Sequence, residues 1–425
     1  MTLGKRLAAV IAAALLIASC SSTKPFVSAP ASSVELSLCE KLEAYGGKSV
    51  RVSMPEMVFD GTEAMERLTS LIEEAEDYIL ISTFLGSSCP NLEGFYDALM
   101  DASERGVRVY FIMDGISSYD MTESQYHMTP LYFLRDRGVN LVEYSPVTAT
   151  HVFHPSSLMV RDHRKLFVFD GKIAVIGGMN TNYISMGAGE GKTQRDSLYF
   201  FRSASLASLL ADEFISIWNS SSVEKISGAD FQRYEDGEGR FDAYLFNKGK
   251  GSEADIAGMY SSLIHEAKES ILILPYLPVL DKNMEASIKE AAGRGVTVHM
   301  LMPLDSREYT RKGLAYCFPK LLDTGMDIYY SAEDENGNEL PLLHEKLMIV
   351  DSRFVVIGSS NFNYRSMGLS HELALVIDSK ELASMLEKHV EDVGKNAQHL
   401  TREESDRMKK EDSSFLLYLF MYYGG

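Results

Sequence analysis

The chain has 425 residues, of which 45% are hydrophobic and 24% are charged, so it is long enough for two or three globular domains or for one duplicated unit. Its formal net charge is −19, and this acidic balance argues against a protein that binds the nucleic-acid backbone. None of the four cysteines has the spacing of a CxxC pair or of a metal site, so we expect no metal centre.

Residues 1–19 have the pattern of an export signal. A positive start at Lys5 and Arg6 is followed by an apolar run over residues 7–17. The sequence Ile-Ala-Ser-Cys that ends at Cys20 resembles the lipobox of bacterial lipoproteins, in which the cysteine is lipidated. This resemblance implies a lipid anchor in the bacterial cell envelope, and the serine after the cysteine favours the outer membrane, on its periplasmic or surface face. An ordinary cleaved signal is the alternative.

Residues 20–49 begin with a stretch rich in Ser, Pro and Ala, and we expect the lipidated cysteine to be followed by a flexible tether. Helical periodicity then alternates with short apolar strands. The expected order is helix 63–76, strand 78–84, helix 92–104, strand 107–113, helix 131–137 and strand 139–144. This alternation predicts a layered α/β half over residues 50–220.

A second half repeats this pattern. Residues 221–252 are rich in Ser, Gly and charge, and we interpret them as a linker. The second α/β half is expected over residues 253–400, because its helix and strand signals parallel those of the first half with small changes in loop length. Residues 401–425 form a C-terminal tail with an apolar end.

One short pattern occurs twice, with an offset of 181 residues. It reads His-x-Lys, then Asp after four residues, then Gly-Gly-x-Asn or Gly-Ser-x-Asn after six more. Apolar, β-prone residues follow each His-x-Lys, so we expect each His and Lys to share one face of a strand. The first copy consists of His163, Lys165, Asp170 and Asn180, and the second of His344, Lys346, Asp351 and Asn361.

Each copy offers an imidazole, an ammonium and a carboxamide, and two such sets facing each other suit a bound phosphate. The lysines and asparagines would hold the anion, while one imidazole attacks phosphorus and the other protonates the leaving oxygen and then activates the acceptor. The lysines stabilise charge on the non-bridging oxygens, a task that other enzymes give to a metal, so we expect no cofactor. The agreement of two copies argues against a chance match.

The duplicated pattern resembles the HKD motif of the phospholipase D superfamily, and its context resembles the cardiolipin synthase-type branch. The similar context comprises the arginine-rich residues 161–165, the Arg195-Asp196 pair, the Phe214-x3-Trp218 end of the first half and the run from Asn361 to Glu372. The resemblance covers about residues 50–400. It implies two tandem α/β/α sandwich halves with one active site at their interface.

The resemblance also implies roles for individual residues. His163 would be the nucleophile and His344 the acid/base. Asp196 and Glu372 would hydrogen-bond the far nitrogens of the two histidines and fix their tautomer and orientation; surface acids at strand starts are the alternative. Asp170 and Asp351 belong to the family's catalytic motif, although we interpret them mainly as turn and scaffold residues.

The implied activity is phosphodiester cleavage in membrane phospholipids through a phosphohistidine (phosphatidyl-enzyme) intermediate. The acceptor is an alcohol, as in cardiolipin synthesis or headgroup exchange, or water, as in a hydrolase. One alternative is a metal-independent nuclease on the same fold, against which the acidic charge and the lipid anchor argue. Another is a non-catalytic envelope lipoprotein that uses the fold for binding, against which two intact motifs argue.

The remaining cysteines and the apolar C-terminal end each allow two interpretations. Cys39 and Cys89 either form a disulfide, as in an exported protein, or are free thiols like Cys317. The nine apolar residues 415–423 are too few to span a bilayer. They either pack on the body or dip into a membrane beside the site, for which their three tyrosines are suited.

Overall fold

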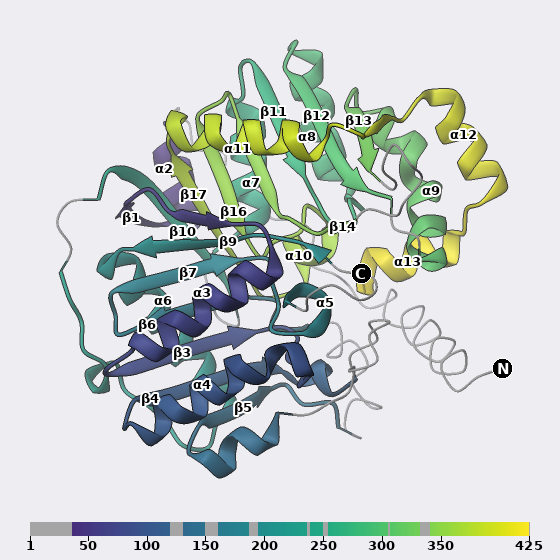
Figure 1. Ribbon diagram of the computed structural model, residues 1–425. Coiled ribbons are helices and arrows are strands. Elements are labelled where there is room, and N and C mark those ends of the chain that lie inside the picture. Colours follow the sequence, from purple (N-terminus) through teal and green to yellow (C-terminus); the bar gives the residue numbers. More distant parts are fainter. Residues whose placement is uncertain are drawn as a thin grey trace, which may run out of the picture.

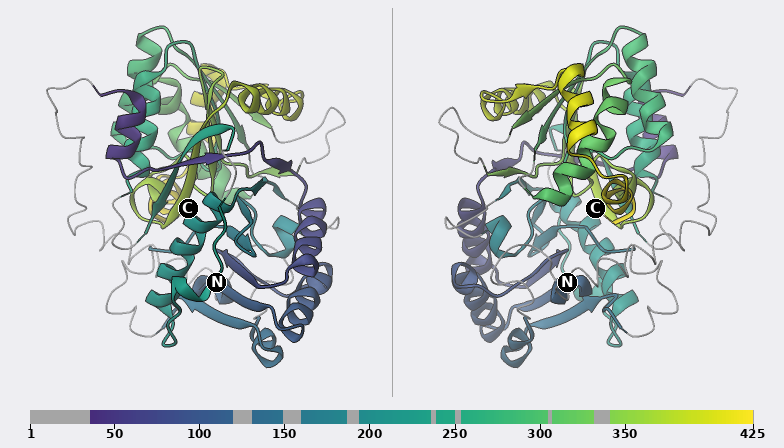
Figure 2. Two further views of the ribbon diagram at one scale, coloured as in Figure 1. Left: turned by 90° about the vertical axis from the view of Figure 1, so that its left-hand side faces the viewer. Right: turned by 90° about the vertical axis from the view of Figure 1, so that its right-hand side faces the viewer.

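A computed structural model of the chain shows two α/β lobes, one above the other (Figures 1 and 2). The export signal and Cys20 predicted from the sequence lie outside the described residues. The structure describes residues 36–119, 131–148, 160–186, 194–235, 239–249, 254–304, 307–331 and 341–424.

The first lobe is built on a seven-stranded sheet in the order β2-β9-β7-β6-β3-β4-β5. The neighbours β3, β4 and β5 are parallel, and the other pairs are antiparallel. The strands are β2 Glu56–Val58, β3 Tyr78–Thr83, β4 Arg108–Asp114, β5 Asn140–Tyr144, β6 Leu166–Phe169, β7 Ile173–Gly177 and β9 Leu198–Arg202.

The second lobe is built on a nine-stranded sheet in the order β1-β10-β17-β16-β15-β11-β12-β13-β18. Its parallel strands β11, β12 and β13 and its hairpin β15-β16 repeat the arrangement of the first sheet. The strands are β1 Lys48–Val52, β10 Phe241–Lys248, β11 Ser270–Leu274, β12 Thr297–Pro303, β13 Asp327–Ser331, β15 Leu347–Val350, β16 Phe354–Gly358, β17 Glu372–Asp378 and β18 Gln398–His399. The predicted duplication of an α/β half is therefore confirmed.

Helices cover both sheets, and a parallel pair of short strands, β8 Gln194–Arg195 and β14 Leu342–Leu343, joins the two halves. The α-helices are α2 Leu38–Ala44, α3 Gly61–Glu74, α4 Glu93–Glu104, α5 Tyr183–Met186, α6 Ala204–Ser221, α7 Ile256–Glu266, α8 Lys282–Gly293, α9 Glu308–Leu322, α10 Tyr364–Gly368, α11 Lys380–Val393, α12 Arg402–Glu411 and α13 Phe415–Gly424. Single 3₁₀ turns lie at Pro90–Leu92, Gly115–Tyr119, Tyr132–Arg137 and Gly228–Asp230.

The central core is shared by both halves. The helices α6 and α11 begin alike, because the hydroxyls of Ser203 and Ser379 each accept a hydrogen bond from the backbone N–H three residues later. Both helices bury their apolar faces in one cluster with the inner faces of the two sheets, as Phe214 of α6 and Leu386 of α11 illustrate. Because this cluster crosses the interface, it holds the two motif-bearing strands in a fixed relation.

The structure corrects two predicted boundaries. Residues 241–248, which we assigned to a linker, form β10, a strand paired with β1 on one side and β17 on the other. The sequence concealed this strand because its short apolar run, residues 243–246, lies between two stretches rich in glycine and charge. The strand β1 crosses the predicted start of the first half at residue 50 but belongs to the sheet of the second half, as its purple ribbon shows (Figure 1).

The structure also describes three cysteines and the apolar C-terminal end, for each of which the sequence allowed two interpretations. Cys39, Cys89 and Cys317 are all free thiols, with Cys39 exposed and the other two buried. Across the described residues, no helix combines the length and the apolar character that crossing a bilayer requires. The C-terminal apolar residues form α13, which packs on the body through contacts with α9 and α10.

Candidate active site

The two motif copies meet at the interface between the halves. The backbone N–H of His163 donates to the carbonyl of His371 at 3.0 Å, and the N–H of His371 donates to the carbonyl of Arg161 at 2.8 Å. In the same way the N–H of His344 donates to the carbonyl of Arg195 at 2.8 Å. Each motif histidine is thus tied through its backbone to the opposite half.

The side chain of each motif histidine also contacts the opposite half. His163 Nδ1 lies 3.1 Å from Glu372 Oε2, and His344 Nδ1 lies 2.5 Å from Asp196 Oδ2. Both carboxylates are fully buried. The two histidines and the two acids proposed from the sequence therefore lie together, and each imidazole is paired with an acid from the other half. With Nδ1 engaged, Nε2 is the ring nitrogen left for a ligand.

The lysines fold back against their own motifs. Lys165 Nζ donates to the carbonyl of His163 at 2.7 Å. Lys346 Nζ lies 3.3 Å from Asp196 Oδ2, and it also donates to the carbonyl of His344. Both lysines are buried. They do not lie on a strand, however, because β6 and β15 begin only at the residue after each lysine.

Burial sets the protonation state of the histidines. Burial, aided by the Lys165 cation, lowers the pKa of His163 to about 4 even though Glu372 opposes the shift. Burial and the Lys346 cation lower the pKa of His344 to about 3. At neutral pH both imidazoles of the free site are therefore neutral, which is the form in which a histidine acts as a nucleophile or base.

The buried site also shifts the pKa values of the two lysines and of Glu372. Burial lowers the pKa of Lys165 to about 7 and also lowers the pKa of Lys346. Burial alone raises a carboxyl pKa, but His163 and Lys165 outweigh it and hold the pKa of Glu372 at about 2. A bound phosphodiester would add negative charge between the lysines, and this charge favours the protonated forms of both lysines and both histidines.

The residue after the motif's first glycine lies against the acid in each half. In the second half the hydroxyl of Ser359 donates to Glu372 Oε2 at 2.6 Å. In the first half the equivalent residue is Gly178, where an added Cβ would overlap Asp196 Oδ1. The hydroxyl of Ser366, in α10, completes the second set with a 2.6 Å bond to Glu372 Oε1.

The asparagines are buried beside the same residues. Asn180 Oδ1 accepts a 3.2 Å hydrogen bond from the N–H of Leu85, which leaves its amide nitrogen as the group able to donate to a phosphate. Asn361 Oδ1 is buried and has no hydrogen-bond partner within the described part of the chain. The arrangement is compatible with the predicted phosphate-holding role of both residues, which stays a prediction.

Comparison with known proteins identifies the family. The model of the phospholipase D-like domain of cardiolipin synthase matches residues 68–218 and 260–393, well over half of the chain. The chain belongs to this family. It is 25% identical over 337 residues to the probable cardiolipin synthase YwiE of Bacillus subtilis, covering 78% of this chain and 64% of that protein. It is 27% identical over 357 residues to the cardiolipin synthase of Alkalihalophilus pseudofirmus, covering 80% of this chain and 66% of that protein.

The match to these relatives is partial in length, since the chain spans less than two thirds of either one. Among solved structures, the phosphatidylserine synthase of Haemophilus influenzae aligns with a TM-score of 0.69 at 12% identity, over 89% of this chain and 95% of that one. At this identity the likeness concerns the fold, and it confirms the predicted phospholipase D-like architecture of two α/β halves.

The family motif also contains an aspartate in each copy, and the structure places these two residues away from the histidines. We included Asp170 and Asp351 because the motif contains them. Each stands in the hairpin turn after its strand, with φ of 51° and 52°, and its carboxylate accepts hydrogen bonds from three consecutive backbone N–H groups ahead of β3 or β11. The whole length of β6 or β15 separates them from the histidines, so they organise turns, as the turn interpretation expected.

Two aromatic residues complete the site and escaped the sequence analysis. The ring centroids of Phe84 and His163 lie 4.9 Å apart, and those of Tyr276 and His344 lie 4.4 Å apart. Both follow equivalent strands, β3 and β11. Arg307 donates to the hydroxyl of Tyr276. Their only sequence signal is an aromatic residue just beyond a buried strand, which does not distinguish a site residue from a core residue.

Behind the site, the residue between each motif's His and Lys is a buried charge, positive in one copy and negative in the other. Arg164 forms two bonds, of 2.7 and 3.0 Å, with Asp162. Glu345 contacts His389 Nε2 at 3.0 Å through both carboxylate oxygens. Each pair lies within one half and gives the buried charge of Arg164 or Glu345 a polar partner, without which its burial would be costly.

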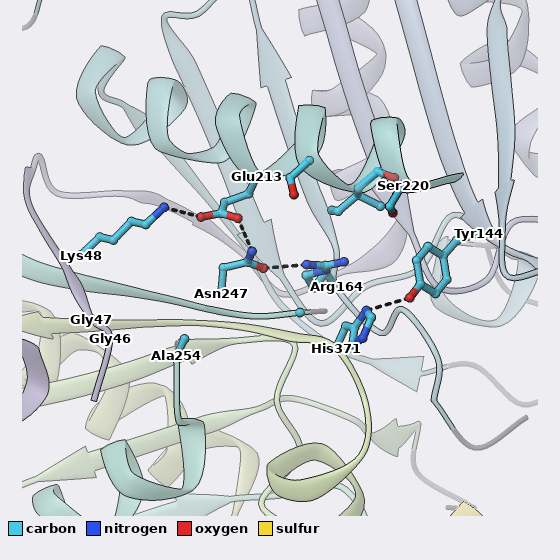
Figure 3. A pocket seen from close by; sticks show the side chains of 13 residues that line it. Gly46, Gly47, Lys48, Tyr144, Arg164, Glu213, Ser220, Asn247, Ala254 and His371 are labelled. Atoms are coloured by element: carbon cyan, nitrogen blue, oxygen red, sulfur yellow. Dashed lines mark hydrogen bonds and ion pairs between the residues drawn. The ribbon is translucent and has the colours of Figure 1, made fainter. Parts of the chain in front are cut away.

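Arg164 also lines a cavity of about 480 Å³ next to the site (Figure 3). A chain of polar contacts runs along it from Lys48 through Glu213 and Asn247 to Arg164. His371, whose neighbour Glu372 holds His163, lines the same cavity. The cavity and the site therefore share one wall, so substitutions in the cavity can disturb the site.

Proposed function

We propose that this chain is a phospholipase D-type enzyme that cleaves phosphodiester bonds of membrane phospholipids and transfers the phosphatidyl group to an alcohol or to water. The observation that carries the proposal is the crossed pair of imidazoles, each held at Nδ1 by a carboxylate from the other half. The relatives named cardiolipin synthase support phospholipids as the substrate class. They also favour transfer between lipids over hydrolysis.

In the first step, His163 Nε2 attacks phosphorus and the bond to the leaving oxygen breaks. His344, which takes up a proton when the anionic substrate binds, gives that proton from Nε2 to the leaving alcohol. The product is a phosphatidyl-histidine whose imidazole carries positive charge, and Glu372 at Nδ1 balances this charge.

In the second step, the acceptor alcohol or water gives its proton to His344 Nε2 and its oxygen attacks phosphorus. The bond between phosphorus and His163 breaks, which restores a neutral imidazole and releases the product. Asp196 holds His344 in the orientation that both steps need. Lys165 and Lys346, together with the amides of Asn180 and Asn361, stabilise charge on the non-bridging oxygens.

Analysis of lipid products tests this proposal. The purified chain is incubated with vesicles of phosphatidylglycerol and phosphatidylethanolamine plus glycerol, and the lipids are analysed by mass spectrometry. We expect cardiolipin or exchanged headgroups with the wild-type chain and with a His399→Ala control, whose histidine is exposed and far from the motifs in sequence. Neither product should form with His163→Ala. Phosphatidic acid alone would identify a hydrolase, and unchanged lipids with a folded protein would overturn the proposal.

We also propose that Cys20 is lipidated and anchors the chain in the bacterial cell envelope, with the outer membrane as the favoured location. The lipobox-like residues before Cys20 support this proposal, although they lie outside the described residues. A Cys20→Ser variant should lose incorporation of labelled palmitate and shift from the membrane fraction toward the soluble fraction. Equal labelling of both proteins would refute the anchor.

A further inference from the structure

The helix α13 lacks the polar face that a surface helix normally shows. Nine of its ten residues, 415–423, are apolar or aromatic. One side packs on α9, where Met421 is 1% exposed and lies against Gly313, a position at which a Cβ would overlap the Met421 sulfur. A helix that is apolar all round is normally buried in a protein core or in a membrane. In the described part of the chain, the packing on α9 and α10 covers one side of α13.

The outward side of α13 is exposed and apolar. Phe415 and Leu416 are 50% and 62% exposed, although burying such side chains is strongly favourable. Leu419, Phe420 and Tyr423 fall on the same side at helical spacing and are partly exposed. Contiguous exposed apolar residues of this kind mark an interaction surface.

Contacts connect α13 to both halves of the site. Tyr422 stacks on Tyr364 of α10, with ring centroids 4.2 Å apart and an angle of 14° between the rings. Two residues along α10, the hydroxyl of Ser366 holds Glu372, the partner of His163. On the other side, Arg307 at the start of α9 donates to Tyr276, which packs on His344. The exposed side of α13 is therefore carried on the elements that border the site.

The chain around α13 is more basic than the protein as a whole. Residues 307–312, at the start of α9, and 409–412, at the end of α12, contain five basic and three acidic residues. Two of the basic residues pair with acids of the same set, Arg311 with Asp412 and Lys312 with Glu308, and the net charge of the set is +2 in a chain of net charge −19. Lys409 lies 5.0 Å from the ring of Tyr316, which in turn packs on Phe415. A basic border around an apolar, tyrosine-containing helix complements an anionic lipid surface.

We propose that the outward side of α13 inserts into the headgroup and acyl boundary of an anionic phospholipid membrane and holds the site against its lipid substrate. Phe415 and Leu416 enter the acyl region, while tyrosine hydroxyls remain at the level of the headgroups. This inference rests on the proposed phospholipid substrate for its purpose, but membrane binding itself requires no turnover. Binding and catalysis can therefore fail separately.

Vesicle flotation of the full chain tests the docking. Every protein compared carries Cys20→Ser, so that no lipid anchor contributes. We expect the chain to float with phosphatidylglycerol vesicles and weakly with phosphatidylcholine vesicles. Leu416→Glu should lower the fraction bound to phosphatidylglycerol by about tenfold or more, because a charge replaces a leucine that docking would bury in the membrane. The control is Met385→Glu, which alters a 45% exposed side chain on α11 and should leave binding unchanged.

A second readout separates docking from chemistry. Cleavage of dihexanoyl phosphatidylglycerol, dispersed as monomers, should be equal in Leu416→Glu and its parent, whereas cleavage of the same headgroup in vesicles should fall in the variant. Undiminished vesicle binding by Leu416→Glu, or an equal loss in Met385→Glu, would overturn the docking. A change from dimer to monomer in Leu416→Glu without lipid would instead assign the surface to a second copy of the chain. Flotation that depends on Leu416 with no turnover of either lipid would uphold docking and refute the enzyme.

Discussion

Replacing Glu372 by glutamine removes one negative charge from His163 while leaving the shape of the side chain nearly unchanged. The carboxylate lies 3.1 Å from Nδ1, on the imidazole that becomes cationic when Nε2 is phosphorylated. Opposite charges about 4 Å apart are worth about 4 kcal/mol at an effective dielectric constant of about 20, so the variant should form the intermediate about 10³-fold more slowly. Hydroxyls of Ser359 and Ser366 remain available to the amide, so the fold should survive.

Single-turnover release of the headgroup from a labelled phospholipid measures this effect. The matched control is Glu381→Gln, at an exposed position on α11. The thermal midpoint of each variant shows whether the protein is folded. A folded Glu372→Gln protein that releases headgroup within tenfold of the wild-type rate would refute the assignment of Glu372 to the charge of His163.

Three further predictions concern pH, packing and metals. Since burial lowers the pKa of Lys165 to about 7, its charge is lost as pH rises, and kcat/KM measured from pH 5 to 9 should fall above about pH 7; a constant value up to pH 9 would contradict the phosphate-binding role. Gly178→Ala should displace Asp196, reduce kcat by at least about 100-fold and destabilise the fold by about 1–3 kcal/mol in urea unfolding, whereas Gly94→Ala, with open space around the added methyl, should do neither. EDTA should leave activity unchanged because lysines supply the positive charge, and inhibition that added metal reverses would contradict this.

The candidate site residues could be selected from the sequence because they stand in a short motif that occurs twice. His163, His344 and their lysines could be selected without any structure, and the two acids could be added through the family resemblance. The crossed pairing could not be predicted, since it depends on how the halves face each other. That relation is fixed by the shared core around α6 and α11, in which no single residue carries a distinctive signal.

The main architecture of the fold could also be predicted from the sequence, whereas one strand and one supporting contact could not. The repeated strand and helix signals gave two α/β halves. The strand β10 was mistaken for a linker because its short apolar run lies between stretches rich in glycine and charge, and its pairing with β1 and β17 is visible only in the fold. The supporting hydroxyl of Ser366 was missed because serine in a short helix has no chemical signature in sequence. Its role appears only when α10 is placed beside Glu372.

The central claim is that one histidine carries the phosphatidyl group while the other handles protons, and trapping the intermediate tests it most directly. In His344→Ala, a phosphatidyl ester with a p-nitrophenol leaving group needs no acid for the first step, whereas the second step lacks its base. Mass spectrometry of the quenched and digested protein should therefore find a phosphatidyl adduct on His163 and none in the double variant His163→Ala with His344→Ala. Turnover with no adduct, or an adduct on another residue, would contradict the account.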